Sequence, residues 1–278
     1  MTISLPRACV IGWPVKHSRS PLIHGFWLSQ LGLAGEYGLA EVAAEQLTAF
    51  LAEMPASGYL GGNVTVPHKE AAFVACAHLT DRAKAIGAVN TLWFEADGLH
   101  GDNTDTEGFA KNLDDFAPQW TKAKVALVLG AGGAARGVLY ALLNADIEKI
   151  ILLNRSIERA EALAEMSGRI VCAPWSELGH HLLQADLLIN TTSLGMSGQP
   201  PLDLDLKSAK PGLIVNDIVY VPLETQLLAQ ARALGLVAVD GLGMLLHQAV
   251  PGFARWFGQV PKVTPELRAY MLRQIEAA

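Results

Sequence analysis

Residues 124–129, Lys-Val-Ala-Leu-Val-Leu, form an almost continuous apolar run that leads directly into a glycine-rich stretch, Gly130 to Ala135. Such a run is typical of a strand buried on both faces of a parallel sheet. The stretch fits the pattern Gly-x-Gly-x-x-Ala, in which the first glycine makes a tight turn and the second lets the backbone approach a pyrophosphate at the start of a helix. A plain βα turn is the alternative, but the strand before the loop and the helical pattern after it favour a dinucleotide site. The predicted contacts are Gly130, Ala131, Gly132, Gly133 and Ala134.

The end of the next predicted strand, residues 149–153, indicates which dinucleotide is bound. An NAD site usually carries Asp or Glu about 20 residues past the glycine loop, where it binds the ribose 2′-hydroxyl. Here Asn154, Arg155 and Ser156 follow the strand, and Arg159 lies one helical turn further on. A guanidinium group matches a 2′-phosphate, so NADP is favoured over NAD. The alternative is that Arg155 and Arg159 are solvated surface residues.

Strand and helix patterns alternate along almost all of the 278 residues, a length that allows one large domain or two of ordinary size. This alternation predicts an α/β fold with a parallel sheet covered by helices. Further strands are expected at 8–12, 36–42, 62–66, 169–173, 186–190, 213–218 and 236–239, with a hairpin formed by 89–94 and 99–103. Helices are expected at 20–31 with Ser20 as the N-cap, at 45–54, from 69, from 156, and at 223–234, 244–257 and 265–275.

Composition and charge exclude several classes of protein. The 21 Lys and Arg against 27 Asp and Glu give a net charge of −6, without the basic clusters of a nucleic-acid-binding domain. The sequence contains no run of 18 apolar residues, so no membrane span is expected. Residues 1–7 lack the basic start of a signal peptide. Cys9, Cys76 and Cys172 are odd in number and far apart, so neither a disulfide framework nor a metal site is expected. We therefore expect a cytoplasmic protein.

Polar loops precede the glycine-rich unit. They contain Ser18 and Ser20, the segment from Asn63 to Lys69, Asn90, and Asp105. Taken singly, each has an ordinary structural explanation, since Ser20 and Asp105 suit helix N-caps and Asn90 suits a turn. Together, such loops can converge on one polyhydroxylated substrate.

These segments resemble the motifs of the shikimate dehydrogenase family, and the resemblance covers essentially the whole chain. The chain departs from the family at Gly25, where Asn often follows His24, and at Trp13 before Pro14; both positions lie beside the substrate-contact positions. The matching segments are, in order, Ser18 to Pro21, Asn63 to Lys69, Ala88 to Thr91, Asn103 to Asp105, Asn154 to Ser156, Asn190 to Met196, Asp217 to Tyr220 and Gly243 to Ala249.

The resemblance implies two α/β domains with a cleft between them, an N-terminal substrate-binding sandwich and a Rossmann-type NADP-binding domain. Residues 1–105, completed by the C-terminal helices 239–278, would form the first domain, and residues 106–238 the second. The implied activity is the reversible NADPH-dependent reduction of 3-dehydroshikimate to shikimate, a step in chorismate and aromatic amino acid biosynthesis, by a monomer or homodimer.

The resemblance also implies roles for individual residues. Ser18 and Ser20 would bind the substrate carboxylate, and Lys69 and Asp105 would stand at the reacting hydroxyl. Lys69 either donates the proton that the carbonyl oxygen must gain or stabilises the charge there, with Asp105 or a water in the relay. The remaining substrate oxygens would meet Thr65, Asn90, Tyr220 and Gln248. The cofactor site would be completed by Asn154, Arg155, Ser156, Arg159, Thr191, Ile218 and Gly241.

Two alternatives remain open. A quinate or dual quinate/shikimate dehydrogenase would share the fold, but enzymes that prefer quinate often replace the second serine and use an acidic residue to bind NAD, whereas this chain has Ser20 and Arg155. A non-catalytic NADP-binding sensor would need no proton relay, so the presence of both Lys69 and Asp105 favours an enzyme.

Overall fold

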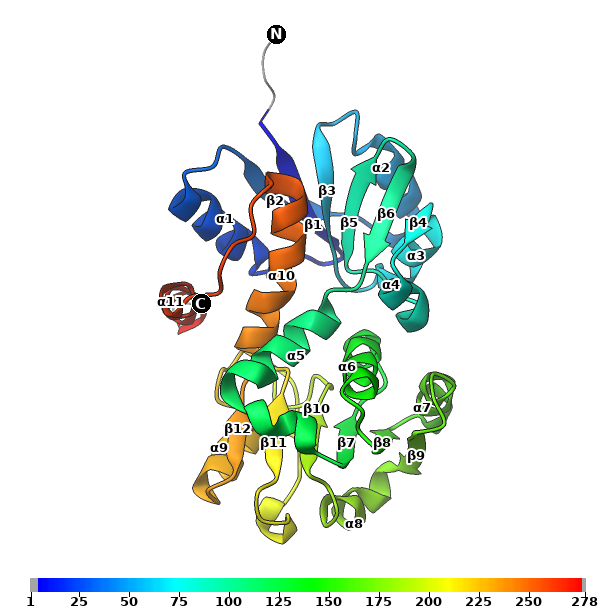
Figure 1. Ribbon diagram of the computed structural model, residues 1–278, viewed down its shortest axis with the longest axis vertical. Helices are drawn as coiled ribbons and strands as arrows, with labels where there is room; N and C mark the ends of the chain where they lie inside the picture. Colours follow the sequence, from blue (N-terminus) through cyan, green and yellow to red (C-terminus); the bar gives the residue numbers. More distant parts are fainter. Residues whose placement is uncertain (1–4, 277–278) are drawn as a thin grey trace. The chain divides into compact units, whose positions relative to one another are not determined.

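The computed structural model describes residues 5–276, which divide into two compact units (Figure 1). Unit 1 consists of Met1–Thr104 and Gln248–Ala278, and unit 2 of Asp105–His247. Within the described residues the strands form two six-stranded sheets, one in each unit. None of the helices among residues 5–276 combines the length and apolar character needed to cross a bilayer. Residues 1–4, part of the segment expected not to be a signal peptide, lie outside this range.

The sheet of unit 1 is mixed and has the order β2-β1-β3-β5-β6-β4. β1 pairs in parallel with β2 and β3, β5 pairs antiparallel with β3 and β6, and the short edge strand β4 pairs in parallel with β6. The β5–β6 pair is the predicted hairpin. The strands are β1 (Arg7–Gly12), β2 (Glu36–Glu41), β3 (Tyr59–Val64), β4 (His78–Leu79), β5 (Thr91–Glu95) and β6 (Gly98–Asp102).

Alternate residues of this sheet enter two different cores, as the twofold repeat of a strand requires. Cys9 and Ile11 pack with the helices that follow β2 and β3, whereas Ala8 and Trp93 pack with Trp256 from the C-terminal part of the chain. Both faces are therefore covered. The helices of this unit are α1 (Ser20–Leu31), α2 (Leu47–Glu53), α3 (Lys69–Ala75), α4 (Asp81–Ile86), the second half of α10 (Leu242–Phe257) and α11 (Pro265–Glu276).

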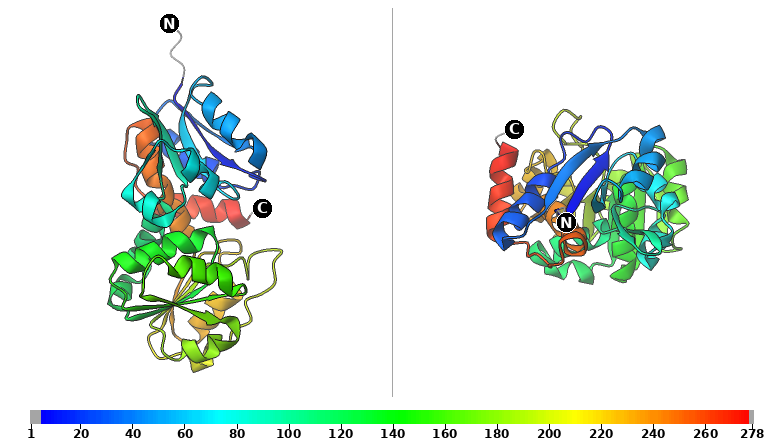
Figure 2. Two further views of the ribbon diagram at one scale, coloured as in Figure 1. Left: turned by 90° about the vertical axis from the view of Figure 1, so that its right-hand side faces the viewer. Right: turned by 90° about the horizontal axis from the view of Figure 1, so that it is seen from above.

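The sheet of unit 2 is entirely parallel and has the order β12-β11-β10-β7-β8-β9, the Rossmann arrangement. Figure 2 shows its twisted strands between helices. The strands are β7 (Val125–Leu129), β8 (Lys149–Asn154), β9 (Ile170–Pro174), β10 (Leu187–Asn190), β11 (Ile214–Asp217) and β12 (Val237–Val239). The helices are α5 (Asp105–Phe116), α6 (Gly133–Asn144), α7 (Ile157–Ala164), α8 (Leu178–Leu182), α9 (Gln226–Ala233) and the first half of α10.

The apolar runs of these strands are explained by burial on both faces. Ala126 and Val128 face a core shared with α5 and α6, while Leu127 and Leu129 face a second core shared with α8 and α9. The fold class predicted from the alternation of strands and helices is confirmed. Since the order of strands reverses between β7 and β10, a ligand is expected at the carboxyl ends of these two strands.

Helix α10 is divided between the units near its middle. Met244 packs in a core of unit 2 and His247 pairs with Asp115 of α5 at 2.8 Å, whereas Phe253 and Trp256 pack against aromatic residues of unit 1. The compact unit 2 extends through the first turns of α10 to His247. The expected return to the first domain at residue 239 stays a prediction.

Candidate active site

Two serine hydroxyls lie together at the start of α1. Ser18 Oγ is 3.3 Å from Ser20 Oγ and accepts a hydrogen bond of 3.3 Å from the Ser20 N–H. The prediction that Ser20 is the N-cap is wrong: Arg19 occupies that position without a side-chain bond, and Ser20 is the first helical residue. Because the hydroxyl of Ser20 does not cap the helix, both hydroxyls can serve an anion at its positive end.

Lys69 is held by its backbone on two sides. It begins α3 directly after His68, whose buried ring lies 2.7 Å from the carbonyl oxygen of Val42. Its own carbonyl accepts a 2.9 Å bond from the Val89 N–H, which ties the loop before Asn90 to the start of the helix. The Lys69 main chain is thus placed independently of its side chain.

Thr65 follows β3 and extends the pairing of that strand with β1, since its N–H donates to the carbonyl of Ile11 at 2.9 Å. Its carbonyl accepts from the N–H of His68 at 2.9 Å, which closes the turn leading to Lys69. A side chain at Gly12 would meet Thr65 Cγ2 at 2.5 Å. The glycine at the end of β1 is therefore needed for Thr65 to keep this position.

Asn90 is the centre of a buried hydrogen-bond network in unit 1. Its Oδ1 accepts bonds from the Thr104 N–H at 2.8 Å, Thr104 Oγ1 at 3.1 Å and Thr91 Oγ1 at 3.0 Å. Its Nδ2 is directed at Gln248 Oε1, 3.5 Å away, and Thr104 Oγ1 also donates to the carbonyl of Gln248 at 2.8 Å. The Asn90 oxygen is thus used by Thr91 and Thr104, and its amide nitrogen is directed at Gln248. Gln248, which is also predicted to contact the substrate, lies beside Asn90 although 158 residues separate them.

Asp105 begins α5 and is the first residue of unit 2, whereas Lys69 belongs to unit 1. Their pairing stays a prediction. The strand before Asp105 is anchored by Asp102, which accepts bonds from Arg82 Nε at 3.0 Å and Thr80 Oγ1 at 2.6 Å. Burial acts to raise the pKa of Asp102, but the bonds from Arg82 and Thr80 outweigh it and lower that pKa.

In unit 2 the glycine loop follows β7 as predicted. Gly130 has φ 101°, and a Cβ there would lie 2.8 Å from both Thr191 Oγ1 and Thr192 Cγ2. Gly132 is the N-cap of the 12-residue helix α6. A Cβ on Gly132 or Gly133 would meet nothing within 4 Å, so open space adjoins the start of α6. A pyrophosphate fits this loop.

Alanine at Gly130 is expected to lower the free energy of unfolding by about 2–5 kcal/mol, the combined cost of a strained backbone and overpacking. Urea unfolding monitored by circular dichroism measures it. Gly132→Ala is the matched control: its φ of −94° suits alanine, so stability should change by less than about 1 kcal/mol. The same methyl group should raise KM for the dinucleotide, because it occupies the open side of the loop. Equal stability losses in both variants would contradict this assignment.

Asn154, at the end of β8, connects the glycine loop to Ser156 by hydrogen bonds; we call this arrangement the Asn154 clasp. Asn154 Oδ1 accepts the N–H of Ala131 at 3.2 Å, and Asn154 Nδ2 donates to the carbonyl of Ser156 at 2.8 Å. Ser156 Oγ donates to Glu158 Oε2 at 2.6 Å, and this bond lowers the pKa of Glu158. A phosphate that used the Ser156 hydroxyl would compete with Glu158 for it.

Arg155 lines a pocket of about 410 Å³ beside the Asn154 clasp. Arg159 is exposed one turn further along α7. Sequence reasoning missed Trp175 and Asp203, which also line the pocket, because they come from loops with no motif of their own; Trp175 follows β9, the strand next to β8. The lining residues are Asn154, Arg155, Trp175, Thr192, Ser193, Leu194, Pro201, Leu202 and Asp203.

The other predicted cofactor residues follow β10, β11 and β12. Thr191 Oγ1 donates to the carbonyl of Leu129 at 2.7 Å, which joins it to the glycine loop. A side chain at Gly241 would lie 2.1 Å from the carbonyl oxygen of Ile218, so glycine permits this contact. Tyr220 follows in the same loop, which Asp217 holds by accepting a 3.1 Å bond from the Val219 N–H.

Comparison with known proteins identifies the family of this chain. Residues 10–92 match the family described as the shikimate dehydrogenase substrate binding domain, and residues 112–196 match the shikimate / quinate 5-dehydrogenase family. The chain is 54% identical to the NADP(+) shikimate dehydrogenase of Azorhizobium caulinodans over 98% of both chains.

Solved structures of shikimate and quinate dehydrogenases also resemble this chain. Shikimate 5-dehydrogenase from Thermus thermophilus in complex with NADP(H) and shikimate has a TM-score of 0.86 and 37% identity, covering 97% of this chain and 99% of that one. Quinate dehydrogenase from Corynebacterium glutamicum in complex with NAD has a TM-score of 0.89 and 30% identity, covering 96% and 98%. The chain belongs to the shikimate dehydrogenase family.

Proposed function

We propose that this protein catalyses the reversible NADPH-dependent reduction of 3-dehydroshikimate to shikimate. The observation that carries the proposal is the presence, in one chain, of a Rossmann unit with an arginine-lined pocket at the end of β8 and of a separate unit that holds Lys69 beside a network of hydrogen-bonding side chains. The curated relative from Azorhizobium, similar over almost its whole length, is named for the same activity.

The two units divide the work in this proposal. Unit 1 binds the substrate and unit 2 binds the cofactor. We expect the same division for the domains predicted from the sequence, which are residues 1–105 with 239–278 for the substrate and residues 106–238 for the cofactor. Ser18 and Ser20 bind the substrate carboxylate through their hydroxyls, which lie 3.3 Å apart. Asn90 donates one amide hydrogen to a ring hydroxyl, because its oxygen accepts bonds from Thr91 and Thr104 and its amide nitrogen is also directed at Gln248. The remaining substrate oxygens contact Thr65, Gln248 and Tyr220.

Reduction of a ketone to an alcohol needs a hydride at carbon and a proton at oxygen. Bound NADPH supplies the hydride. Lys69 donates a proton to the reacting oxygen or stabilises the negative charge that develops there, and Asp105 orients both the ammonium group and the hydroxyl. In the reverse direction the same pair receives the proton.

The quinate alternative is not favoured. Quinate dehydrogenase from Corynebacterium glutamicum, solved with NAD, is 30% identical to this chain, against 54% for the NADP(+) shikimate dehydrogenase of Azorhizobium. Ser20 is present, and Arg155 lines the pocket where a 2′-phosphate would be bound. A sensor without activity would leave the ordered surroundings of Lys69 without a role.

Steady-state turnover tests the proposal directly. Purified protein should reduce NADP⁺ when shikimate is added, with a kcat/KM at least tenfold above the values for quinate with NADP⁺ and for shikimate with NAD⁺. Faster turnover of quinate with NAD⁺ would assign the alternative enzyme, and no turnover with any pair would assign the sensor.

Alanine at Ser18 or Ser20 is expected to raise KM for shikimate roughly ten- to a hundredfold and to change kcat by less than about threefold, since each removes one hydrogen bond to a charged group worth about 1.5–3 kcal/mol. Ser29→Ala, at the other end of α1, is the control for substitution in this helix. Initial rates over a range of shikimate concentrations measure both constants. A loss in kcat as large as that of a catalytic variant would contradict the carboxylate assignment.

The cellular setting belongs to the same proposal. We place the protein in the cytoplasm as a monomer or homodimer that binds a small-molecule substrate and no nucleic acid. Its cysteines are free thiols, and burial raises the pKa of Cys9 to about 12, which makes this thiol unreactive.

A further inference from the structure

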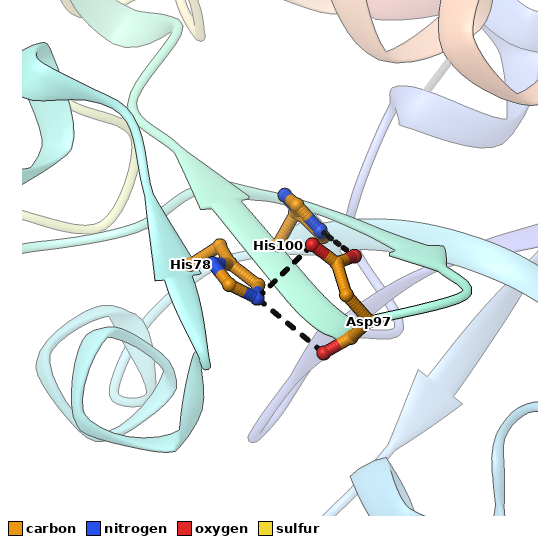
Figure 3. A group of neighbouring side chains, drawn as sticks. All are labelled: His78, Asp97 and His100. Atoms are coloured by element: carbon orange, nitrogen blue, oxygen red, sulfur yellow. Dashed lines mark hydrogen bonds and ion pairs between the residues drawn. The ribbon is translucent and has the colours of Figure 1, made fainter.

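Two histidines and an aspartate converge at the edge of the sheet in unit 1 (Figure 3). His100 Nε2 lies 2.8 Å from Asp97 Oδ1, and His78 Nε2 lies 3.2 Å from Asp97 Oδ2. His78 Nε2 is also 3.3 Å from the carbonyl oxygen of Asp97. One ligand atom from each of the three side chains lies within 4.8 Å of the others. The proposed catalytic chemistry uses none of the three.

The backbone places these side chains together. β4 and β6 are parallel neighbours, and His78 is in register with His100, so both imidazoles stand on the same face of the sheet. Asp97 lies in the tight turn between β5 and β6, three residues before His100. Asp97 and His100 are close in the sequence, but only the pairing of β4 with β6 brings His78 to them. The expectation of no metal site rested on the cysteines alone.

The ring of His100 stacks with two neighbouring aromatic rings. It lies 5.4 Å from the ring of Trp93 and 4.6 Å from that of His78, at interplanar angles of 28° and 25°. Arg255 also covers the ring of Trp93, with its guanidinium carbon 3.7 Å from the ring centroid. This stack limits rotation of the imidazole and keeps Nε2 directed at Asp97.

We propose that His78, Asp97 and His100 bind one divalent transition-metal ion. Two imidazole nitrogens and one carboxylate oxygen suit Zn²⁺, Cu²⁺ or Ni²⁺ better than Mg²⁺ or Ca²⁺, which prefer oxygen ligands. The side chains of His78 and Asp97 are 47% and 59% exposed, so water can complete the coordination. Bound there, the ion links the β5–β6 turn to the edge strand β4. Ordinary histidine–aspartate ion pairs are the competing explanation.

Zinc titration of the tag-free full-length protein by isothermal calorimetry tests this site. We expect one Zn²⁺ per chain, and a loss of affinity of at least tenfold in His78→Gln and in Asp97→Asn, each of which removes one ligand. The matched control is His247→Gln. His247 lies 2.8 Å from Asp115 and its side chain is 15% exposed, nearly the values for His100 and Asp97, but it belongs to no three-ligand cluster among the described residues. The affinity of the His247→Gln variant for Zn²⁺ should equal that of the wild type.

A second measurement reports on the site itself. Cu²⁺ bound next to His100 should quench the fluorescence of Trp93, so Trp93→Phe should lose most of the copper-dependent quenching seen in the wild type. Far-ultraviolet circular dichroism establishes that each variant is folded. Equal zinc affinity in the wild type and both cluster variants, or no zinc binding by the wild type, would overturn the proposal and leave the three side chains as ion pairs. The dehydrogenase assay is independent of either outcome.

Discussion

Replacing Lys69 by alanine is expected to lower kcat for shikimate oxidation by roughly 10²–10⁴-fold, the usual contribution of a positioned proton-transfer group. KM for shikimate should change far less, because the ammonium interacts most strongly with the charge that develops on the oxygen in the transition state. The fold should survive, since the position of the Lys69 backbone depends on His68 and Val89 and not on its side chain. Steady-state kinetics at saturating NADP⁺ measure both constants.

Lys84→Ala is the matched control, because Lys84 is an exposed lysine of unit 1 that lies 3.4 Å from Asp81. Its removal should leave kcat unchanged. Asp105→Asn should lower kcat to a similar extent as Lys69→Ala, and the double variant should lose little more than either single variant if the two residues act as one group. A kcat near the wild-type value in Lys69→Ala would remove this residue from the mechanism.

The strands of unit 2 could be predicted from the sequence because burial on both faces leaves a continuous apolar run. β7, β8 and β10 are runs of apolar residues with adjacent side chains in two different cores. In unit 1 this sequence signal is weaker. β4, two residues long, and α4, six residues long, were not predicted, because elements so short show no periodicity. The helix expected at 45–54 begins with a 3₁₀ turn, and α2 itself starts at Leu47.

In the candidate sites, too, residues that are consecutive in the chain could be predicted, and residues brought together by folding could not. The glycine loop and Asn154 could be predicted because they are consecutive in the chain and follow buried strands. The use of Asn90 Oδ1 by Thr91 and Thr104 could not, since it depends on where β5 and β6 end. Trp175 and Asp203 reach the Arg155 pocket from separate loops, and only folding brings them together.

Arg155→Ala is expected to raise KM for NADP⁺ roughly ten- to a hundredfold and to leave KM for NAD⁺ almost unchanged. A charge-assisted bond to a phosphate contributes about 1.5–3 kcal/mol, and each 1.4 kcal/mol is about a factor of ten in affinity. Arg155 lines the pocket at the end of β8, where an NAD-dependent enzyme would carry an acidic residue. Steady-state kinetics with both cofactors, on the wild type and the variant, measure the effect.

The charges around Arg155 determine how large the increase in KM for NADP⁺ is within the ten- to hundredfold range. Asp203 lines the same pocket, and Glu158 accepts the hydroxyl of Ser156, so carboxylates stand close to the proposed phosphate position. Without the guanidinium, these groups would repel the 2′-phosphate, which favours the upper end of the range. Arg159→Ala is the comparison variant: Arg159 is exposed one turn further along α7, and its replacement should raise KM for NADP⁺ less than Arg155→Ala does. Equal losses for NADP⁺ and NAD⁺ in Arg155→Ala would mean that Arg155 supports the adenosine or the fold, and a wild-type preference for NAD⁺ would contradict the assignment of the pocket to the 2′-phosphate.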